Sequence, residues 1–204
     1  KQNTNAIASV LNVYITSKDK IYRDLIYNWY RSLKKYLQNE NNLFINKWSK
    51  NEKGLWEASN AQLVDLLCDF HFYLKDEYFI FEAEKIANEL IKKVEKFHML
   101  PTNEKSYKAH CDQQVDFAVA LIKLYKLTKN KKYLNNSITI MSSIKKYFYK
   151  KNGIVEFVNI HNKMETTELC KIKFLILSLK GWLAIKYYDD IYKNKEFTRL
   201  LNDR

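Results

Sequence analysis

Apolar residues recur along the chain at the spacing of amphipathic helices. Val115, Val119 and Ile122 share one face if this stretch is helical, and Leu134 and Ile138 share another after a short polar break. Residues three and four positions apart lie on the same side of a helix, so each stripe predicts a helix that packs by one face. Two helices joined by so short a break run antiparallel, which predicts a helical hairpin.

The same pattern occurs four times along the chain. Each copy has an apolar end that contains an aromatic residue, a Lys-Asp or Lys-Asn turn, and an aromatic residue that opens the next amphipathic run. Asp and Asn side chains cap a following helix by accepting a backbone hydrogen bond. We expect the aromatic residue to pack back on the preceding helix. The turns are Lys18-Asp19, Lys75-Asp76, Lys129-Asn130 and Lys193-Asn194, and the aromatic residues are Tyr22, Tyr78, Tyr133 and Phe197.

This spacing predicts an all-α fold of antiparallel helical hairpins. Only three Gly and one Pro occur in 204 residues, too few for the tight turns of a sheet-rich fold. The irregular stretch from Gly153 is expected to form a turn and a brief strand. We expect residues 1–204 to form a single repeat domain of about three and a half hairpins. First helices are predicted at 4–16, 59–74, 111–128 and 166–187, and second helices at 20–38, 77–97, 131–150 and, as a stub, 195–202.

One stretch of the third repeat resembles a known family. The string from Ala120 to Leu134, ALIKLYKLTKNKKYL, is similar to the hairpin signature of (α/α) toroid proteins, the six-hairpin glycosidase-like superfamily. That superfamily includes N-acylglucosamine 2-epimerases and unsaturated glucuronyl hydrolases. The resemblance implies a partial (α/α) toroid in which the first helix of each hairpin is the inner one. Since a full toroid has six hairpins, we expect the chain to be part of a longer protein or an incomplete, arc-shaped array.

The resemblance also implies where a site lies. In proteins of this superfamily the loops that enter the first helices converge on one mouth of the toroid, and the enzymes place their working residues there. The matching positions of this chain are polar residues before, or in the first turns of, apolar helices. They are Trp56, Asn60 and Gln62 in the second repeat, His110, Asp112, Gln113 and Asp116 in the third, and Glu165 and Glu168 in the fourth.

These residue types suit chemistry on a sugar. The resemblance implies a carbohydrate-active or carbohydrate-binding domain, leaning towards a hydrolase, lyase or epimerase that uses general acid/base catalysis on an oligosaccharide. A His near a carboxylate, as in His110 and Asp112, or two opposed carboxylates, as in Asp112 and Glu165, can exchange protons with a substrate. Trp56 offers a flat apolar face for a pyranose ring. The other candidates could bind hydroxyl groups: Asn60, Gln62, Gln113 and Glu168.

Each of these residues also has a purely structural interpretation. A carboxylate at a helix start, such as Asp112 or Glu165, is favoured there by the helix dipole without any substrate. A non-catalytic helical-repeat module therefore remains an alternative, with a protein partner bound through the uncapped helices at its ends.

Charge adds a further alternative, a polyanion-binding domain that uses a Lys-rich face. The formal charge is +12, from 35 Lys and Arg against 23 Asp and Glu. Only four of these cations are Arg, the residue that binds phosphate and guanine with two parallel hydrogen bonds. A nucleic-acid partner is therefore not expected, and a solvated Lys face explains most of the charge.

Other classes have no support in the sequence. Cys68, Cys111 and Cys170 are widely spaced, without a metal-type pair or a disulfide framework. The sequence contains neither a phosphate-binding Gly-rich loop nor a His pair with metal-ligand spacing, so we expect no cofactor and no metal. It also lacks the roughly 18 uncharged apolar residues of a membrane-spanning helix. The chain starts at Lys1 without Met, which is compatible with removal of a leader or a preceding domain, so no localisation is predicted.

Overall fold

The fold was analysed in a computed structural model. The structure describes residues 2–47, 53–55, 57–103, 107–150 and 153–162. The expected helices at 166–187 and 195–202 lie outside this part of the chain.

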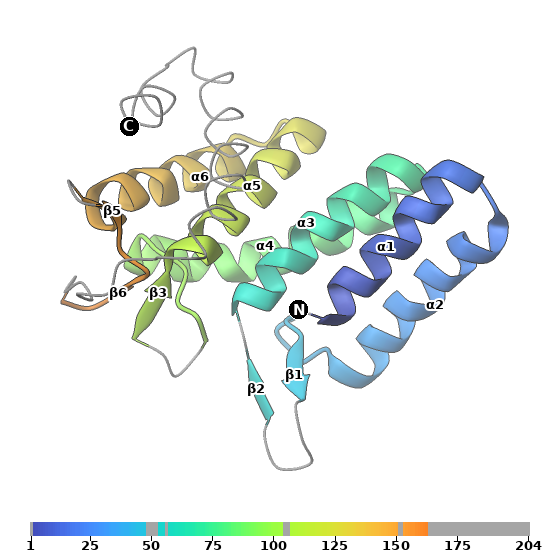
Figure 1. The fold of residues 1–204 in the computed structure, drawn as a ribbon, viewed down its shortest axis with the longest axis horizontal. Coiled ribbons are helices and arrows are strands. Elements are labelled where there is room, and N and C mark those ends of the chain that lie inside the picture. The colour runs from blue at the N-terminus through green and yellow to red at the C-terminus, as the bar shows by residue number, and fades with distance from the viewer. Residues whose placement is uncertain (1, 48–52, 56, 104–106, 151–152, 163–204) are drawn as a thin grey trace.

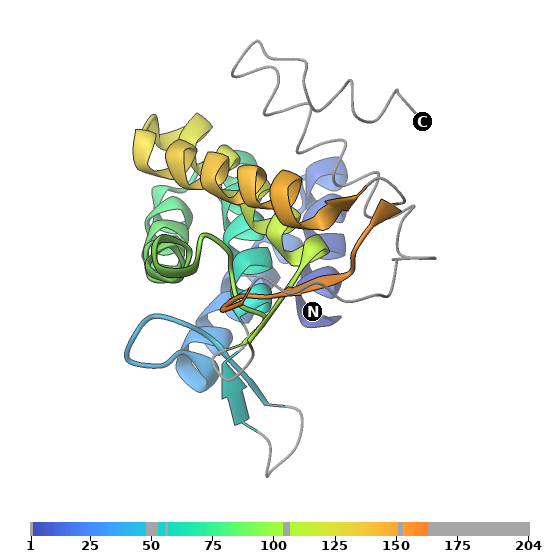
Figure 2. The ribbon, with the colours of Figure 1, turned by 90° about the vertical axis from the view of Figure 1, so that its left-hand side faces the viewer.

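Six α-helices form three antiparallel hairpins in the described residues (Figure 1). Neighbouring first helices also pack on each other, α1 on α3 and α3 on α5. Figures 1 and 2 show these three helices on one side of the molecule, with their hairpin partners on the other. This arrangement confirms the predicted all-α fold of helical hairpins. The hairpins are α1 (Gln2–Ser17) with α2 (Lys20–Leu37), α3 (Glu57–Leu74) with α4 (Glu77–Phe97), and α5 (Cys111–Thr128) with α6 (Lys131–Ser143).

The three hairpin turns are nearly identical. Lys18, Lys75 and Lys129 each adopt a left-handed conformation, with φ of 57°, 56° and 59°. In each turn the next residue caps the second helix, because its side-chain oxygen accepts a hydrogen bond from the backbone N–H two positions on. The predicted capping by Asp and Asn is confirmed. The capping residues are Asp19, Asp76 and Asn130.

We expected Tyr78, the aromatic residue of the second turn, to pack back on the preceding helix, and this expectation is wrong. Tyr78 is 38% exposed, whereas Phe79 is fully buried. In the third turn Tyr133, three positions after Asn130, reaches the core as expected, whereas Tyr22 at the same position after Asp19 is only half-buried. Phe79 holds that position after Asp76, and Tyr78 lies one residue too early to turn its ring inward. The remaining expected aromatic residue of the last turn, Phe197, lies outside the described residues.

The end of the third hairpin also differs from the prediction of one helix over 131–150. The α-helix α6 ends at Ser143 and continues as one π-helical turn, η1 (Ile144–Phe148). A short antiparallel pair follows, β4 (Tyr149–Lys150) with β5 (Gly153–Ile154). The brief strand expected after Gly153 is confirmed by β5 and by the later strand at 157–159, and Gly153 itself belongs to β5.

Two further strand pairs lie beside the amino ends of α3 and α5 (Figure 1). Strand β1 (Ile45–Lys47) pairs with β2 (Lys53–Leu55), just before α3. Strand β3 (Lys108–His110) runs directly into α5 and pairs with β6 (Phe157–Asn159), which follows the third hairpin. The N–H of Cys111 extends this pairing by donating to the carbonyl of Glu156 at 3.0 Å. The β1–β2 pair is a hairpin within the loop between α2 and α3, whereas the β3–β6 pair ties the loop before α5 to the segment after α6. Both pairs lie at one end of the inner helices, which is the predicted mouth (Figure 1).

Two buried side-chain amides attach the return loops to the inner helices. Asn60, 1% exposed, accepts from the N–H of Phe44 at 2.7 Å and donates to its carbonyl at 3.0 Å. Gln114, 0% exposed, makes the same two bonds to Leu100, both at 2.7 Å. Both amides are the fourth residue of their helix. We call each of these paired bonds an amide clasp.

Removing one amide clasp should destabilise the whole domain. In the Gln114→Ala variant the N–H and carbonyl of Leu100 lose their partners inside the protein, and we expect a loss of about 2–4 kcal/mol in the free energy of unfolding. Urea denaturation followed by circular dichroism measures it. The neighbouring Gln113→Ala variant is the matched control, with an expected loss below about 1 kcal/mol. Equal losses in the two variants would show that the clasp has no special role.

Candidate functional site

The candidate site begins with His110, which strand pairing holds at the mouth. His110 is the last residue of β3 and the N-cap of α5, and it pairs in register with Phe157 of β6. The two rings lie 5.4 Å apart between centroids and are tilted by 32°. The imidazole is half-buried, so one side of it rests on an aromatic ring while part of it stays open to solvent.

Two further polar residues occupy the first turn of α5. Asp112 is half-buried, and its Oδ1 accepts a hydrogen bond from the N–H of Gln113 at 2.9 Å. The Oε1 of Gln113 is buried and accepts no hydrogen bond from any described residue. A buried acceptor without a donor is costly, and such an atom is a natural partner for a ligand hydroxyl group.

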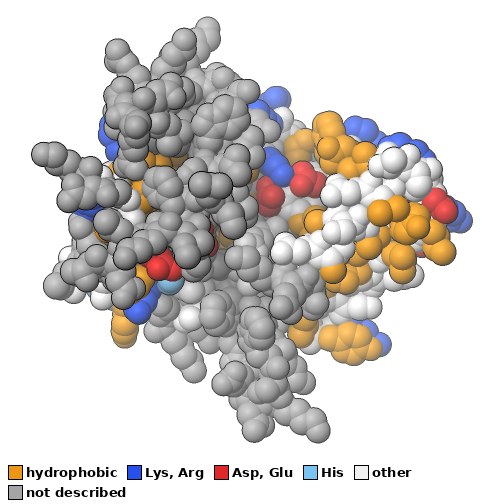
Figure 3. Space-filling model, in the orientation of Figure 1, with side chains coloured by type: hydrophobic (Ala, Val, Ile, Leu, Met, Phe, Trp, Pro, Cys, Tyr) orange, Lys and Arg blue, Asp and Glu red, His pale blue; other side chains and the backbone are white. Residues whose placement is uncertain are grey.

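A seam of charged and polar side chains continues from the mouth along the contact between α3 and α5. Near the mouth, Nε2 of Gln62 donates to Oδ2 of Asp116 at 2.9 Å. Farther along, Nζ of Lys123 lies between two carboxylates of α3. It forms an ion pair with Asp65, at 2.7 Å from Oδ1, in which the angles are not those of a hydrogen bond. It donates a hydrogen bond to Oδ1 of Asp69 at 2.9 Å. Figure 3 shows acidic and basic side chains gathered on this face of the molecule.

Burial and the charges within this seam together shift the pKa values of Asp65 and Lys123. Burial raises the pKa of the Asp65 carboxyl; Lys123 acts in the opposite direction, while Asp69 and Asp116 raise it further. Burial would lower the pKa of Lys123, but Asp65 and Asp69 outweigh it and the pKa is raised. Lys123 is therefore held as a cation, and the raised pKa of Asp65 favours the protonated form of its carboxyl group.

The structure brings some of the predicted site residues together and gives one a different task. His110, Asp112 and Gln113 lie within four consecutive residues at the start of α5, and Gln62 contacts Asp116 of the same helix. Asn60 was expected to bind substrate, but both ends of its amide are occupied by Phe44 in the amide clasp. Trp56, Glu165 and Glu168 lie outside the described residues.

Sequence reasoning missed the seam residues Asp65, Asp69 and Lys123. A signal was present, because Asp65 and Asp69 interrupt the apolar run of the second inner helix, and Lys123 interrupts that of the third. A charge inside such a run indicates an ion pair or a lined cavity. The sequence does not show that the charges of two different helices face each other.

A cavity opens towards the other end of the same two helices. It holds about 270 Å³ and is lined mainly by apolar groups and by the seam residues Asp69 and Lys123. Burial raises the pKa of the Cys68 thiol in its wall, with Asp65 and Asp69 adding to the effect. A thiol held protonated is a poor nucleophile, so this cavity is a weaker candidate for chemistry than the mouth.

Two searches of the described residues bear on other functions. No group of three or more His, Cys, Asp or Glu side chains in this part of the chain is arranged to hold a metal ion. None of the described helices has both the length and the apolar character needed to cross a membrane.

Comparison with known proteins identifies the fold. Neither protein-family models nor curated protein sequences gave a match. Among solved structures, the chain is similar to a GH76 α-mannanase of Bacteroides thetaiotaomicron, at 13% identity and a TM-score of 0.78 over 97% of this chain and 57% of that chain. A cellobiose 2-epimerase of Spirochaeta thermophila gives 13% identity and a TM-score of 0.70, over 93% and 52%.

A possible GH105 member of Salmonella enterica is similar as well, at 13% identity and a TM-score of 0.72 over 91% of this chain and 55% of that one. The chain thus spans about half the length of the solved structures that it matches. At these identities the likeness concerns the fold, which is a partial (α/α) toroid, as the sequence resemblance implied.

Lys123 should be essential to the stability of the seam. The Lys123→Met variant leaves Asp65 and Asp69 without a shared cation, and we expect it to lose about 1–3 kcal/mol at neutral pH, since the groups are only partly buried. The raised pKa of Asp65 means that the folded protein binds this proton more tightly than the unfolded chain does. Removing Lys123 takes away the charge that opposes this rise, so the folded variant binds the proton more tightly still and the deficit should shrink as pH falls.

Urea denaturation of both proteins across acidic to neutral pH measures this deficit. The double variant Asp65→Asn with Lys123→Met is the control, because it removes one of the two repelling carboxylates and should recover part of the loss. A deficit that stays constant with pH and is unchanged by Asp65→Asn would contradict the described network.

Proposed function

We propose that the chain forms part of a carbohydrate-processing (α/α) toroid whose working groups lie at the amino ends of the inner helices. The observation that carries the proposal is the group at the start of α5. A half-buried imidazole, a carboxylate and an amide with an unsatisfied buried oxygen follow one another there, at His110, Asp112 and Gln113. Proton exchange and hydroxyl recognition both require such groups.

In this proposal His110 and Asp112 exchange protons with the substrate, and Glu165 supplies a second carboxylate from the fourth repeat. Gln62 and Gln113 bind hydroxyl groups, together with Glu168, and Trp56 stacks on a sugar ring. Gln62 is already oriented by Asp116, which fixes its amide and leaves its oxygen available for a further contact. Asn60 is left out, since its amide is part of the fold.

Two reaction types fit these groups. Hydrolysis of a glycosidic bond uses an acid that protonates the leaving oxygen and a second carboxylate that acts as base or nucleophile. Epimerisation uses an acid and a base on opposite sides of one carbon. The structural neighbours include a mannanase and a cellobiose 2-epimerase, so both reactions occur on this fold. Since the chain spans about half of those proteins, we further propose that it belongs to a longer protein whose additional hairpins complete the wall of the site.

Substitutions at the start of α5 should remove activity and leave the fold intact. We expect Asp112→Asn or His110→Ala to lower turnover about 10²–10⁴-fold, the usual contribution of a general acid or base. The melting temperature should stay within a few degrees of that of the unchanged protein. Reducing-sugar and epimerisation assays on α-mannan, cellobiose and unsaturated glucuronyl disaccharides provide the readout.

The matched control is Glu95→Gln, which neutralises an exposed carboxylate on α4 and should leave turnover unchanged. Unchanged turnover in Asp112→Asn and His110→Ala would contradict the proposed roles. Unfolding of these variants would show that both residues serve as structural caps.

A further inference from the structure

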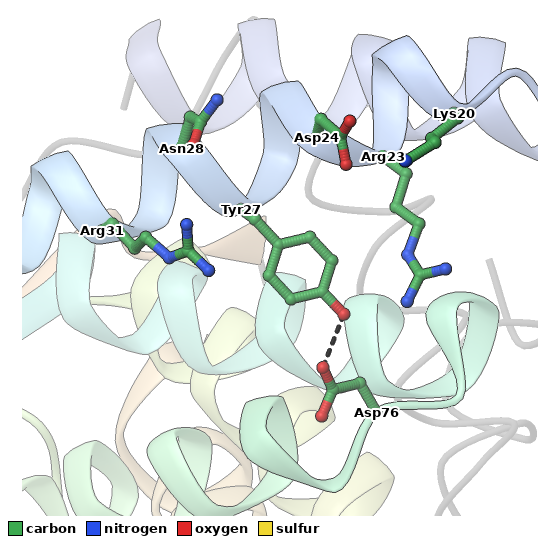
Figure 4. Close-up of a pocket in the computed structure, with 7 residues that line it drawn as sticks. All are labelled: Lys20, Arg23, Asp24, Tyr27, Asn28, Arg31 and Asp76. Carbon is green, nitrogen blue, oxygen red and sulfur yellow. Dashed lines mark hydrogen bonds between the residues drawn. The ribbon is translucent and has the colours of Figure 1, made fainter.

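A second, polar groove lies at the opposite end of the hairpins from the mouth. It is an open cavity of about 610 Å³ between α2 and the turn that joins α3 to α4 (Figure 4). Six of its lining residues recur at three- and four-residue intervals on α2, so they form one continuous stripe of that helix. The lining residues are Lys20, Arg23, Asp24, Tyr27, Asn28 and Arg31 of α2, with Asp76 at the start of α4.

Arginine is concentrated in this groove. The chain has 31 Lys but only four Arg, and Arg23 and Arg31 are two of those four. Both guanidinium groups project from α2 to the same side and flank Tyr27 (Figure 4). Arg31 and Asn28 form no hydrogen bond or ion pair with the residues that the structure describes. A guanidinium binds a carboxylate, sulfate or phosphate with two parallel hydrogen bonds, which makes Arg31 an available anion-binding group.

At the floor of the groove, the carboxylate of Asp76 already accepts two hydrogen bonds from within the protein. The hydroxyl of Tyr27 donates a short hydrogen bond to Oδ2 of Asp76, and Oδ1 accepts from the N–H of Tyr78 at 2.9 Å. The hydrogen bond from Tyr27 lowers the pKa of Asp76, against the opposing effect of burial. The carboxylate of Asp76 is therefore occupied by contacts within the fold. The lining of the groove has three cations against two carboxylates, so its net charge is positive.

We propose that this groove binds an acidic oligosaccharide, with carboxylate groups of separate sugar residues held by Arg23 and Arg31. The two residues are eight positions apart on α2, a rise of about 12 Å, so they suit an extended ligand with repeated charges better than one small anion. Asn28 lies between the two arginines on α2 and supplies donors for hydroxyl groups there, and Lys20 adds a further donor beyond Arg23.

The chemistry of the lining favours a sugar chain over an acidic peptide. Every lining side chain except Tyr27 is charged or an amide. Peptide docking relies on apolar anchors that fill desolvated pockets, whereas a sugar chain offers hydroxyl and carboxylate groups along its length. The groove lies on the outer helix of the first hairpin, so binding there does not depend on the chemistry proposed at the mouth.

Calorimetric titration of the full chain with short oligogalacturonates at low salt tests the proposal. We expect saturable binding that weakens as salt rises, since the contacts are ionic and exposed. Arg31→Gln and Arg23→Gln should each weaken the affinity about tenfold, a typical effect of losing one charge-assisted pair. Arg31→Lys should recover only part of that loss, because an ammonium cannot bind with two parallel hydrogen bonds.

Lys35→Gln is the matched control, since it removes one positive charge from an exposed site of α2 outside the groove, and it should bind like the unchanged protein. His110→Ala should also bind normally, which separates this groove from the mouth. Three results would overturn the proposal: no binding at low salt, equal weakening by Lys35→Gln and Arg31→Gln, or binding of poly-glutamate as tight as that of oligogalacturonate.

Discussion

The amide clasp is the constraint on which the arrangement of this domain depends. Each repeat must lead the chain from an outer helix back to the next inner helix, and the return passes through the core, where Phe44 and Leu100 are buried. Backbone groups buried there need partners. Asn60 and Gln114 supply both a donor and an acceptor to them. Because Gln114 is fixed to its loop, the start of α5 is fixed too, and with it the positions of His110 and Asp112.

The regular repeat also explains how the polar seam forms. Gln62 and Asp116, which are hydrogen-bonded, lie 54 residues apart, as do Asp69 and Lys123. Asn60 and Gln114 have the same separation, so these pairs occupy equivalent positions in successive repeats. Equivalent positions of neighbouring inner helices face each other, and complementary residues at them hold the helices together. Repeated pairs of this kind place polar groups along the inner helices, starting at the mouth. In the proposed function, the substrate lies against this inner layer.

Local signals predicted the hairpins, but not the contacts between them. The capped turns at Asp19, Asp76 and Asn130 and the helix positions followed from short-range periodicity and capping chemistry, which depend on neighbouring residues. The sequence predicted that Asn60 binds a sugar. It does not show that the amide is buried against Phe44, because that residue lies 16 positions earlier in the chain. Strand β6 joins β3 from beyond the third hairpin, so the support of His110 by Phe157 could not be foreseen. The ion pairs of Lys123 depend likewise on how two helices meet.

The proposed carbohydrate site at the amino ends of α3 and α5 includes one of the four histidines of the chain, His110. The most direct test is nuclear magnetic resonance of the four histidine rings during titration with neutral oligosaccharides. We expect saturable shifts of the His110 ring signals, while those of His71, near the hairpin turn at the other end of α3, stay in place. Sugar binding that shifts His71 and leaves His110 unchanged would place the site elsewhere and contradict the account.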